Sequence, residues 1–556
     1  MTEQEFISLL SKNYNNVEKF KEICRQNPIL TMETIFIEPK LGKRIKLNYA
    51  QKEVIQKVLN SEDVYALGSR QIAGKSTIAL YLAAFLSVFY NNYYVYYISL
   101  EASRQCTEFL QNIERIIDNL PFKVEHKRST LNNAQIVLDN NSVIMTAAVA
   151  RKKEFSSISK SRTAHFIIID EFSDIKGNME LLSTISATMA ATRKLSQTTK
   201  LPTSIILISN AFEIVDEHHQ YAYNLWMQSV EGKTNYKPVL FYYRALLGEE
   251  EANKFIEEER KRGVPIKQIL INYECYFVRS ENTFINDDEL LNQLYSAKRS
   301  YYTITISGLT KNYPVKVYDV SKLSDVHFIA VDTATKYGSD FYAIVGVTNE
   351  GEIILEYNDK LSVDEAIDLI KKLDQLCPNG YFVIERNMGS HIIELLENEI
   401  KMYYSDNKPG IFTTEKNKKT MFVILKEFLY RNPHLMYSES ILRQLLTLKT
   451  YKNSFRSDSH DDLAMAYAIA IYVTELERLK EETSQYINNE NILTILDNIS
   501  NIVNTNNINN KLQQNSNNII IQIHDNYSTG YSEPLYYNPF ETVDMFIRDF
   551  GKKSLM

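Results

Sequence analysis

The sequence predicts an α/β protein built from two successive sheets, each flanked by helices. Short apolar runs alternate with amphipathic helical stretches from about residue 47 to 230, and a second series of the same kind begins near residue 326. Such alternation is typical of largely parallel sheets whose strands are connected by helices. A chain of 556 residues is also too long for one hydrophobic core, so at least two domains are expected.

The composition is that of an ordinary globular protein, with 44% hydrophobic and 24% charged residues. The formal net charge of −7 excludes a uniformly basic, histone-like surface, although local basic patches can still bind DNA. The four cysteines are far apart and form no C-x-x-C pair, which argues against a disulfide framework or a structural zinc site. We expect no signal peptide and no membrane span, because the longest apolar stretches are broken by polar residues.

Residues 1–45 precede the first series as a helical lead-in. The series itself contains the strand-like runs DVYAL, YYVYYISL, AQIVL, SVIMTAA, HFIIID and SIILIS. The mixed, charged residues that follow are expected to form a lid (about 231–310) of the first domain (46–310), and then a linker (311–325).

Residues 69–77, SRQIAGKST, follow the first of these runs and open an apolar helix. In the P-loop pattern G-x-x-x-x-G-K-S/T, backbone amides surround a phosphate, the lysine meets the β- and γ-phosphate oxygens, and the hydroxyl holds Mg²⁺. Gly74, Lys75 and Ser76 fit the pattern, whereas Ser69 stands at the first glycine position. The loop predicts a nucleotide site at a helix N-terminus; a Gly-Lys-Ser turn without a ligand is the alternative.

The run HFIIIDEF ends in two acids that would complete such a site. Asp170, at the carboxyl end of the strand, suits the Mg²⁺ water shell, and Glu171 suits a general base that orients the attacking water. One strand later, SIILISN ends in Ser209 and Asn210, where a γ-phosphate could be sensed. Capping of the next helix would explain either acid alone. Together with the P-loop, however, they predict an ATPase domain.

Acidic residues in apolar settings mark the second series. Asp332 ends FIAVD, with Asp340 eight residues later; Glu385 ends YFVIE; Asp461 and Asp462 begin an Ala-rich helix. In an RNase H-like sheet such positions converge into a carboxylate cluster that binds two Mg²⁺ or Mn²⁺ ions and cleaves a phosphodiester. Each acid alone would be a solvated surface group. Since Asp461 and Asp462 are adjacent, only one can face the metals squarely, and we favour Asp462.

Basic segments near these acids could hold a phosphate backbone. Residues 441–457 contain four basic residues and no acid, residues 415–419 read EKNKK, and the basic stretch 151–162 precedes the HFIIID run. Each phosphate contact would add affinity that salt weakens. Ordinary solvated lysines are the alternative for any single residue.

In this order the motifs resemble those of the large terminase subunit of tailed double-stranded-DNA bacteriophages, over roughly residues 45–480. SRQIAGKST is similar to the family's variant P-loop, in which Ser-Arg-Gln often replaces the leading glycine. IIIDEF is similar to the family's Walker B motif, and ISNA is similar to its coupling motif. INYECYFVRSENTFI (271–285) is similar to the segment that closes the ATPase lid, and GIFTTEKNKK (410–419) to a further nuclease segment. The resemblance implies a P-loop (RecA/ASCE-type) ATPase domain followed by an RNase H-like nuclease domain (326–482).

The resemblance also implies roles for single residues. Gln51, in LNYAQKEVIQKVL, would contact adenine, and Arg70 would sense the γ-phosphate. The residues expected to be catalytic are Glu171, Asp332, Glu385, Asp461 and Asp462. The expected ATP-binding set is Gln51, Ser69, Arg70, Gln71, Gly74, Lys75, Ser76, Thr77, Asp170 and Asn210. The expected metal ligands are Ser76 and Asp170 in the ATPase site and Asp332, Asp340, Glu385, Asp461 and Asp462 in the nuclease site.

A protein of this family would act as a DNA-packaging motor with ATP and Mg²⁺, or Mn²⁺ in the nuclease, as cofactors. A ring of subunits, expected to be a pentamer, would dock on the portal protein of a procapsid, translocate double-stranded DNA and cut the concatemer; the small terminase subunit is a further expected partner. The chain would work in the host cytoplasm, transiently on the procapsid, and be absent from the mature virion. No membrane partner is expected.

Two other functions remain open. A repair-type helicase–nuclease also joins a P-loop motor to a nuclease, but such motors normally carry two RecA-like halves and the sequence shows one P-loop core. A packaging subunit with an inactive nuclease is the second, although the acids of the cluster are complete. Residues 483–556 begin Asn-rich, which is typical of a linker, and end in a segment that is either a docking peptide or a disordered tail.

Overall fold

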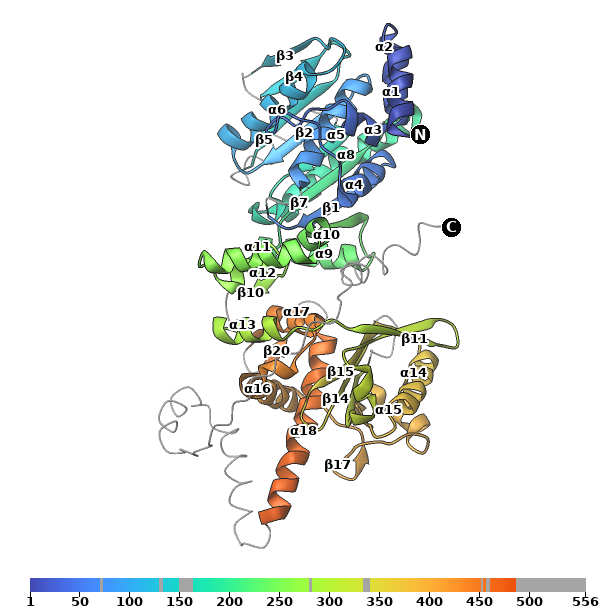
Figure 1. Ribbon diagram of the computed structural model, residues 1–556, viewed down its shortest axis with the longest axis vertical. Coiled ribbons are helices and arrows are strands. Elements are labelled where there is room, and N and C mark those ends of the chain that lie inside the picture. Colours follow the sequence, from blue (N-terminus) through green and yellow to red (C-terminus); the bar gives the residue numbers. More distant parts are fainter. Residues whose placement is uncertain are drawn as a thin grey trace. The chain divides into compact units, whose positions relative to one another are not determined.

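The computed structural model describes residues 1–70, 74–129, 134–149, 164–279, 283–333, 341–451, 454–456 and 461–486. The chain divides near residue 281 into two compact units, and each is described by itself (Figure 1). Within the described ranges, no helix has both the length and the apolar character that a membrane span requires.

An eight-stranded sheet forms the centre of the first unit. Its strands are β1 (Asp63–Gly68), β2 (Tyr94–Ser99), β3 (His126–Ser129), β4 (Gln135–Leu138), β5 (Val143–Ala148), β6 (Phe166–Ile169), β7 (Ser204–Ser209) and β9 (Tyr236–Phe241). Their order is β3-β4-β5-β2-β6-β7-β1-β9. The strands from β5 to β9 in this order run parallel, whereas β3 and β4 join one edge as antiparallel strands.

Helices and short elements surround this sheet. They are α1 (Glu3–Lys12), α2 (Val17–Gln26), α3 (Pro28–Thr34), α4 (Tyr49–Leu59), α5 (Lys75–Phe89), the π-helix η1 (Ala102–Cys106), α6 (Thr107–Asp118), the 3-10 helix η3 (Phe172–Asp174), α8 (Asn178–Thr199), β8 (Glu213–Ile214), α9 (Glu217–Val230), α10 (Tyr243–Leu247), α11 (Glu249–Lys261), α12 (Ile266–Asn272) and β10 (Val278–Arg279). The strands β8 and β10 pair with each other in parallel.

Both faces of the sheet are covered. Along β1, Val64 and Ala66 belong to one core with residues of α1 to α6, while Tyr65 and Leu67 belong to a second core with residues of α8 and α9. Successive residues of a strand point to opposite faces, so a sheet buried on both sides needs continuous apolar runs. This is why the runs in the sequence show little alternation.

Three strands differ from the parallel sheet that the six apolar runs predicted, and the first of them, β3, is not one of those runs and pairs antiparallel with β4. The AQIVL run forms β4, which pairs antiparallel with β5 because only residues 139–142 join them, too few for a crossover. The strand β9 lies in the segment assigned to the lid and was not expected. Lys237 and Pro238 interrupt its apolar pattern, and proline is tolerated there because β9 lies at an edge of the sheet.

A buried ion-pair network joins the segment after α12 to the segment that begins α10. The Glu274 side chain is fully buried and accepts hydrogen bonds from the hydroxyls of Tyr242 (2.6 Å) and Tyr243 (3.0 Å). The guanidinium of Arg244 donates to the same carboxylate, with its Nη2 2.6 Å from Oε1. Because this charge is buried and several donors depend on it, the network fixes the chain that follows β9.

We predict that Glu274→Ala lowers the free energy of unfolding by about 3–5 kcal/mol, because it removes the buried carboxylate that Tyr242, Tyr243 and the mostly buried Arg244 share. Thermal or urea unfolding of the full chain measures the effect. Glu250→Ala is the control: Glu250 forms an exposed pair with Lys254, and its loss is expected to leave the midpoint unchanged. Equal midpoints for both variants would contradict the assigned role of Glu274.

The second unit contains a six-stranded sheet. Its strands are β11 (Tyr302–Ser307), β12 (Asn312–Val317), β13 (Phe328–Asp332), β14 (Phe341–Val347), β15 (Ile353–Lys360) and β16 (Tyr381–Ile384). In the order β11-β12-β15-β14-β13-β16, β16 is parallel to β13 and the other neighbours are antiparallel. Met402 and Ile411 then bridge the β16 edge in parallel. An RNase H-like sheet begins with three antiparallel strands, and later strands pair in parallel at the edge formed by the first of them. Here β13, β14 and β15 are the three antiparallel strands, and β16 pairs in parallel with β13.

Helices cover both faces of this sheet as well. They are α13 (Asp288–Ala297), the 3-10 helix η4 (Val320–Asp325), α14 (Val363–Leu376), α15 (Arg386–Leu396), α16 (Glu415–Arg431), the 3-10 helix η5 (Pro433–Leu435), α17 (Glu439–Thr447) and α18 (Asp462–Tyr486), with the hairpins β17 (Tyr404–Ser405)–β18 (Lys408–Pro409) and β19 (Lys449–Tyr451)–β20 (Ser454–Arg456). The helices α14 and α15 share a core with Ile329 and Val331, whereas α18 packs on β13 and β14 (Figure 1).

The predicted fold class is therefore confirmed: an α/β unit with a P-loop-bearing parallel sheet precedes an RNase H-like unit. The structure differs from the expected domain boundaries. Residues 302–317, assigned to the lid and linker, form β11 and β12, and β12 pairs with β15 in the second sheet. Only some of their side chains are buried, so their sequence does not show the apolar run of a core strand.

Candidate nucleotide and metal sites

The carboxyl ends of β1, β7 and β6 lie side by side at one edge of the first sheet. These strands end at Gly68, Ser209 and Ile169, so the P-loop, Asn210 and Asp170 follow neighbouring strand ends. In open α/β sheets this edge is the usual place for a ligand. The sheet order thus brings together three motifs that lie far apart in the sequence.

Lys75 lies at the centre of this edge. Its side chain is buried, and its Nζ donates to the carbonyls of Gly68 (2.9 Å) and Ser69 (2.8 Å) and to Asn210 Oδ1 (3.0 Å). Burial lowers the pKa of Lys75 to about 8, although the nearby Asp170 works in the other direction. A phosphate would meet this ammonium at the N-terminus of α5 and favour its charged form.

The loop backbone around Lys75 depends on two glycines. Gly74 has a φ of 69°, and a Cβ there would lie 2.6 Å from Gln51 Nε2. A Cβ on Gly68 would lie 2.4 Å from the Phe241 carbonyl oxygen, so β9 approaches β1 too closely for any side chain. Gly68 is therefore required by the packing of β9 against β1, directly before Ser69.

Ser69 and Arg70 connect the loop to the segment after α12. The Ser69 hydroxyl donates to the Tyr273 carbonyl (2.7 Å) and accepts from the Tyr243 amide (3.1 Å), and the Arg70 amide donates to the Asn272 carbonyl (2.6 Å). The Ser69 side chain thus holds the loop in place. Arg70 itself is exposed.

The remaining residues of the expected nucleotide set are placed differently. Ser76 is exposed and Thr77 half-buried in the first turn of α5, whereas Gln71 lies outside the described residues. Gln51 is buried: its Nε2 donates to the Gly74 carbonyl (3.0 Å) and its Oε1 accepts from the Asn48 amide (3.0 Å). The Nε2 end of the Gln51 amide thus supports the loop and the Oε1 end caps α4, and a contact of Gln51 with adenine stays a prediction.

Asp170 and Glu171 complete the edge. The Tyr97 hydroxyl donates to Asp170 Oδ2 (2.9 Å), and desolvation raises the pKa of Asp170 despite this bond. A divalent cation beside this carboxylate would favour its charged form, so Asp170 together with the exposed Ser76 fits a Mg²⁺ site. Glu171 has a φ of 53°, a left-handed conformation that non-glycine residues seldom adopt and that surrounding structure must enforce.

Gln105 is a residue that the sequence analysis missed. Its Nε2 donates to Glu171 Oε2 (2.8 Å) from the π-helix η1, directly after β2. Single π-helical turns occur frequently at functional sites because they re-aim side chains. The sequence contains no signal for this turn, since Gln105 only reaches Glu171 through the irregular backbone.

The predicted carboxylates of the second unit also come together. Asp332 ends β13, Glu385 follows the neighbouring parallel strand β16, and Asp461 and Asp462 lie at the start of α18. Desolvation, then the charges of Glu385 and Asp462, raise the pKa of Asp332 well above its ordinary value. Asp462 acts on Asp332 more strongly than Asp461 does. Asp340 lies outside the described residues.

Neighbouring side chains orient this cluster. The Thr413 hydroxyl donates to Glu385, and Lys418 Nζ lies 3.4 Å from Asp461 Oδ2. Desolvation raises the pKa of Glu385 and of Asp461, and Lys418 lowers both. Among the described residues, Lys418 is the cation that acts on Glu385 and Asp461. One lysine does not balance four acids, and a divalent metal ion would supply the missing positive charge.

Asp332, Glu385 and Asp462 therefore fit metal ions. Within the described part of the chain, three ligand atoms lie within 4.8 Å of one another only at Asp216, His218 and His219, so the oxygens of the nuclease cluster are more widely spread. Of the basic residues noted above, Arg443 pairs with Glu439 (2.7 Å), and the stretch 151–162 lies outside the described residues.

No family model and no curated protein matches this sequence. Among solved structures, the chain is similar to the large terminase of a thermophilic bacteriophage, with 10% identity over 77% of this chain and 99% of that one, at a TM-score of 0.33. It is also similar to the large terminase nuclease of the thermophilic phage G20c (14% identity, 33% of this chain, 97% of that one, TM-score 0.25). A third likeness is to a mutant ATPase domain of the Thermus phage P74-26 large terminase (13% identity, 42% and 95% coverage, TM-score 0.33).

These similar structures come from large terminases, the family that the sequence resembles. Other structures of the same kind contain bound magnesium in the nuclease or ATP-gamma-S in the whole protein. At such identities and TM-scores the likeness carries no functional weight. The function proposed below rests on the geometry of the two sites.

We predict that Glu171→Gln binds ATP but turns it over about 100- to 10,000-fold more slowly, because the general base is lost while the fold and the phosphate contacts remain. Steady-state phosphate release and nucleotide-binding titration measure the two effects. Glu62→Gln is the control, because Glu62 immediately precedes β1 at the opposite end of the sheet. Near-normal turnover by Glu171→Gln would remove Glu171 as the base.

Proposed function

We propose that this chain is a DNA-packaging motor of the large terminase kind, with an ATPase site in its first unit and a metal-dependent endonuclease site in its second. The observation that carries the proposal is the presence of both constellations in one chain. A buried lysine lies beside the Asn210 amide and near Asp170, at three neighbouring strand ends, and a carboxylate cluster lies on an RNase H-like sheet. A motor that also cuts its own substrate needs both.

In the first site, the amides at the N-terminus of α5 and the Lys75 ammonium would bind the phosphates of ATP. Ser76 and Asp170 would hold Mg²⁺, which supplies charge stabilisation to the transferred phosphoryl group. Glu171, oriented by Gln105, would accept a proton from the attacking water. These roles are supported by the places of Lys75 and Ser76 in the first turn of α5 and of Asp170 and Glu171 directly after β6.

Hydrolysis would be coupled to the rest of the unit through the hydrogen bonds of Lys75, Ser69 and Arg70. Asn210 bonds to Lys75, and the Ser209 hydroxyl beside it accepts from the Ser173 amide (3.1 Å), two residues after Glu171. On the other side, Ser69 and Arg70 bond to the segment after α12. A change in how Lys75 is bonded would therefore move both the β7 end and the lid segment.

In the second site, Asp332, Glu385 and Asp462 would hold Mg²⁺ or Mn²⁺, which activate a water and stabilise the leaving oxygen of a phosphodiester. Lys418 remains beside Asp461 and would offset its charge. Thr413 fixes the Glu385 carboxylate, so that this ligand does not have to be ordered when the ions bind.

The partners follow from the proposed function. Double-stranded DNA would be the substrate of both sites, with the portal protein and the small terminase subunit as docking partners and a ring of copies, proposed as a pentamer, on the procapsid. The setting would be the host cytoplasm, with no membrane and no place in the mature virion. A repair-type helicase–nuclease would instead separate the strands of a forked duplex, and a packaging subunit with an inactive nuclease would turn over ATP without cutting.

We predict that Lys75→Ala abolishes ATP turnover but leaves metal-dependent DNA cutting, because the two sites are built on separate sheets. Phosphate release and plasmid cleavage, measured on the same preparation, separate the two activities. Loss of both in a variant that still unfolds cooperatively would contradict the division of labour between the sites.

We predict that Asp332→Asn abolishes cutting of a covalently closed plasmid with Mg²⁺ or Mn²⁺ while ATP turnover persists. The matched control is Asp359→Asn, which removes a carboxylate of β15 in the same sheet that is paired with Lys311 and is expected to leave cutting intact. Undiminished cutting by Asp332→Asn would place the nuclease elsewhere, and strand separation without cutting would favour the helicase alternative.

A further inference from the structure

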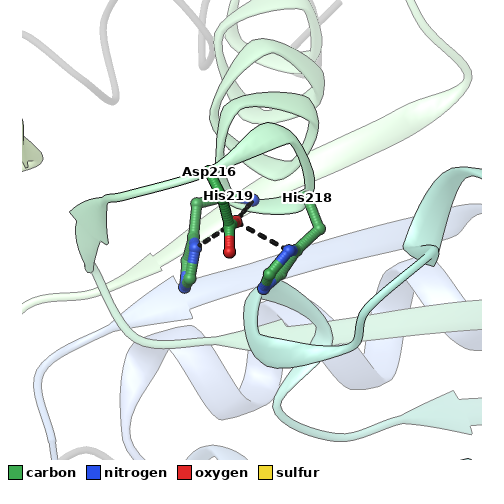
Figure 2. Close-up of side chains that lie close together, drawn as sticks. All are labelled: Asp216, His218 and His219. Atoms are coloured by element: carbon green, nitrogen blue, oxygen red, sulfur yellow. Dashed lines mark hydrogen bonds and ion pairs between the residues drawn. The ribbon is translucent and has the colours of Figure 1, made fainter. Parts of the chain in front are cut away.

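Three metal-ligating side chains meet at the start of α9 (Figure 2). Asp216 is the residue immediately before the helix, and His218 and His219 lie in its first turn. The Nδ1 atoms of His218 and His219 approach the same oxygen, Asp216 Oδ1, at 2.6 and 2.7 Å. The imidazole centroids are 4.3 Å apart, and both side chains are largely buried while Asp216 is open to solvent.

Helix capping alone does not require this arrangement. Asp216 accepts the His219 amide (3.4 Å) as an ordinary N-terminal cap, and a cap needs one carboxylate and no imidazole. Here two imidazoles converge on that carboxylate instead. Two nitrogens and one oxygen, all within 4.8 Å of one another, are the ligand types and the spacing that a borderline divalent ion such as Zn²⁺ prefers.

A second carboxylate, that of Asp174, lies near the other ring nitrogen of His219. His219 Nε2 lies 3.5 Å from Asp174 Oδ1, on the side of the ring away from Asp216. Metal-binding histidines commonly donate their second N–H to such a carboxylate, which fixes the tautomer and raises the basicity of the ligating nitrogen.

We propose that Asp216, His218 and His219 form a binding site for Zn²⁺, with Asp174 as a positioning residue. The site does not depend on the proposed packaging function. A bound ion would connect the start of α9 to η3 through the contact between His219 and Asp174. Asp174 is the last residue of η3 and lies three residues after Glu171. With three protein ligands, one coordination position stays open to water, as in zinc sites that are not purely structural.

The test is a Zn²⁺ titration of the full chain by calorimetry, with Mg²⁺ in excess so that hard carboxylate sites are occupied. Wild type is expected to bind one tight Zn²⁺ equivalent. Asp216→Asn keeps a good helix cap and should weaken this binding at least about tenfold, and His218→Gln/His219→Gln should abolish it. Asp174→Asn should weaken it by about 10- to 100-fold, as loss of an outer carboxylate does.

His126→Gln is the matched control, because His126 faces a single carboxylate, Asp118, at 3.8 Å in the same unit. Its Zn²⁺ binding is expected to equal that of wild type, and Zn²⁺ should raise the unfolding temperature of both but not of Asp216→Asn. Equal Zn²⁺ affinity in wild type and Asp216→Asn would overturn the proposal. So would a wild type that binds no tight equivalent under these conditions.

Discussion

The organisation of the first unit depends on one buried cation. Lys75 lies inside the protein with its ammonium held by two loop carbonyls and the Asn210 amide oxygen, and burial brings its pKa to about 8. An ammonium is costly to bury without anionic partners, so the loop is poised to exchange neutral partners for phosphate oxygens. The contacts of Ser69, Arg70 and Asn210 pass any such exchange to β7 and to the segment after α12.

The second unit also contains buried charged groups without enough partners of opposite charge, but there the groups are negative. Asp332, Glu385 and Asp461 lie where desolvation disfavours their charged forms, and among the described residues Lys418 offsets only a part of the negative charge that these acids would carry. Ligands of opposite charge satisfy the two places: phosphate at the first and divalent metal at the second. Each unit thus has an excess of one charge at its site, positive in the first and negative in the second. A bound phosphate or a bound metal ion would neutralise it.

The sequence was informative wherever function lies at the end of a buried strand. Asp170, Asn210, Asp332 and Glu385 follow continuous apolar runs, so both their secondary structure and their common edge could be predicted from local pattern. The sequence was uninformative where tertiary contacts decide. Strands β9, β11 and β12 have mixed burial, Gln105 depends on an irregular turn, and the convergence of both histidines on Asp216 appears only once α9 is folded.

The central claim, two separate sites on one chain, is tested most directly by anomalous X-ray scattering from crystals grown with Mn²⁺ and a non-hydrolysable ATP analogue. Manganese is expected in two places: beside Ser76 and Asp170 with the phosphates of the analogue, and among Asp332, Glu385 and Asp462. Manganese only in the first place would leave a nucleotide-binding protein without a nuclease. Manganese at neither place, with nucleotide bound away from Lys75, would contradict the account as a whole.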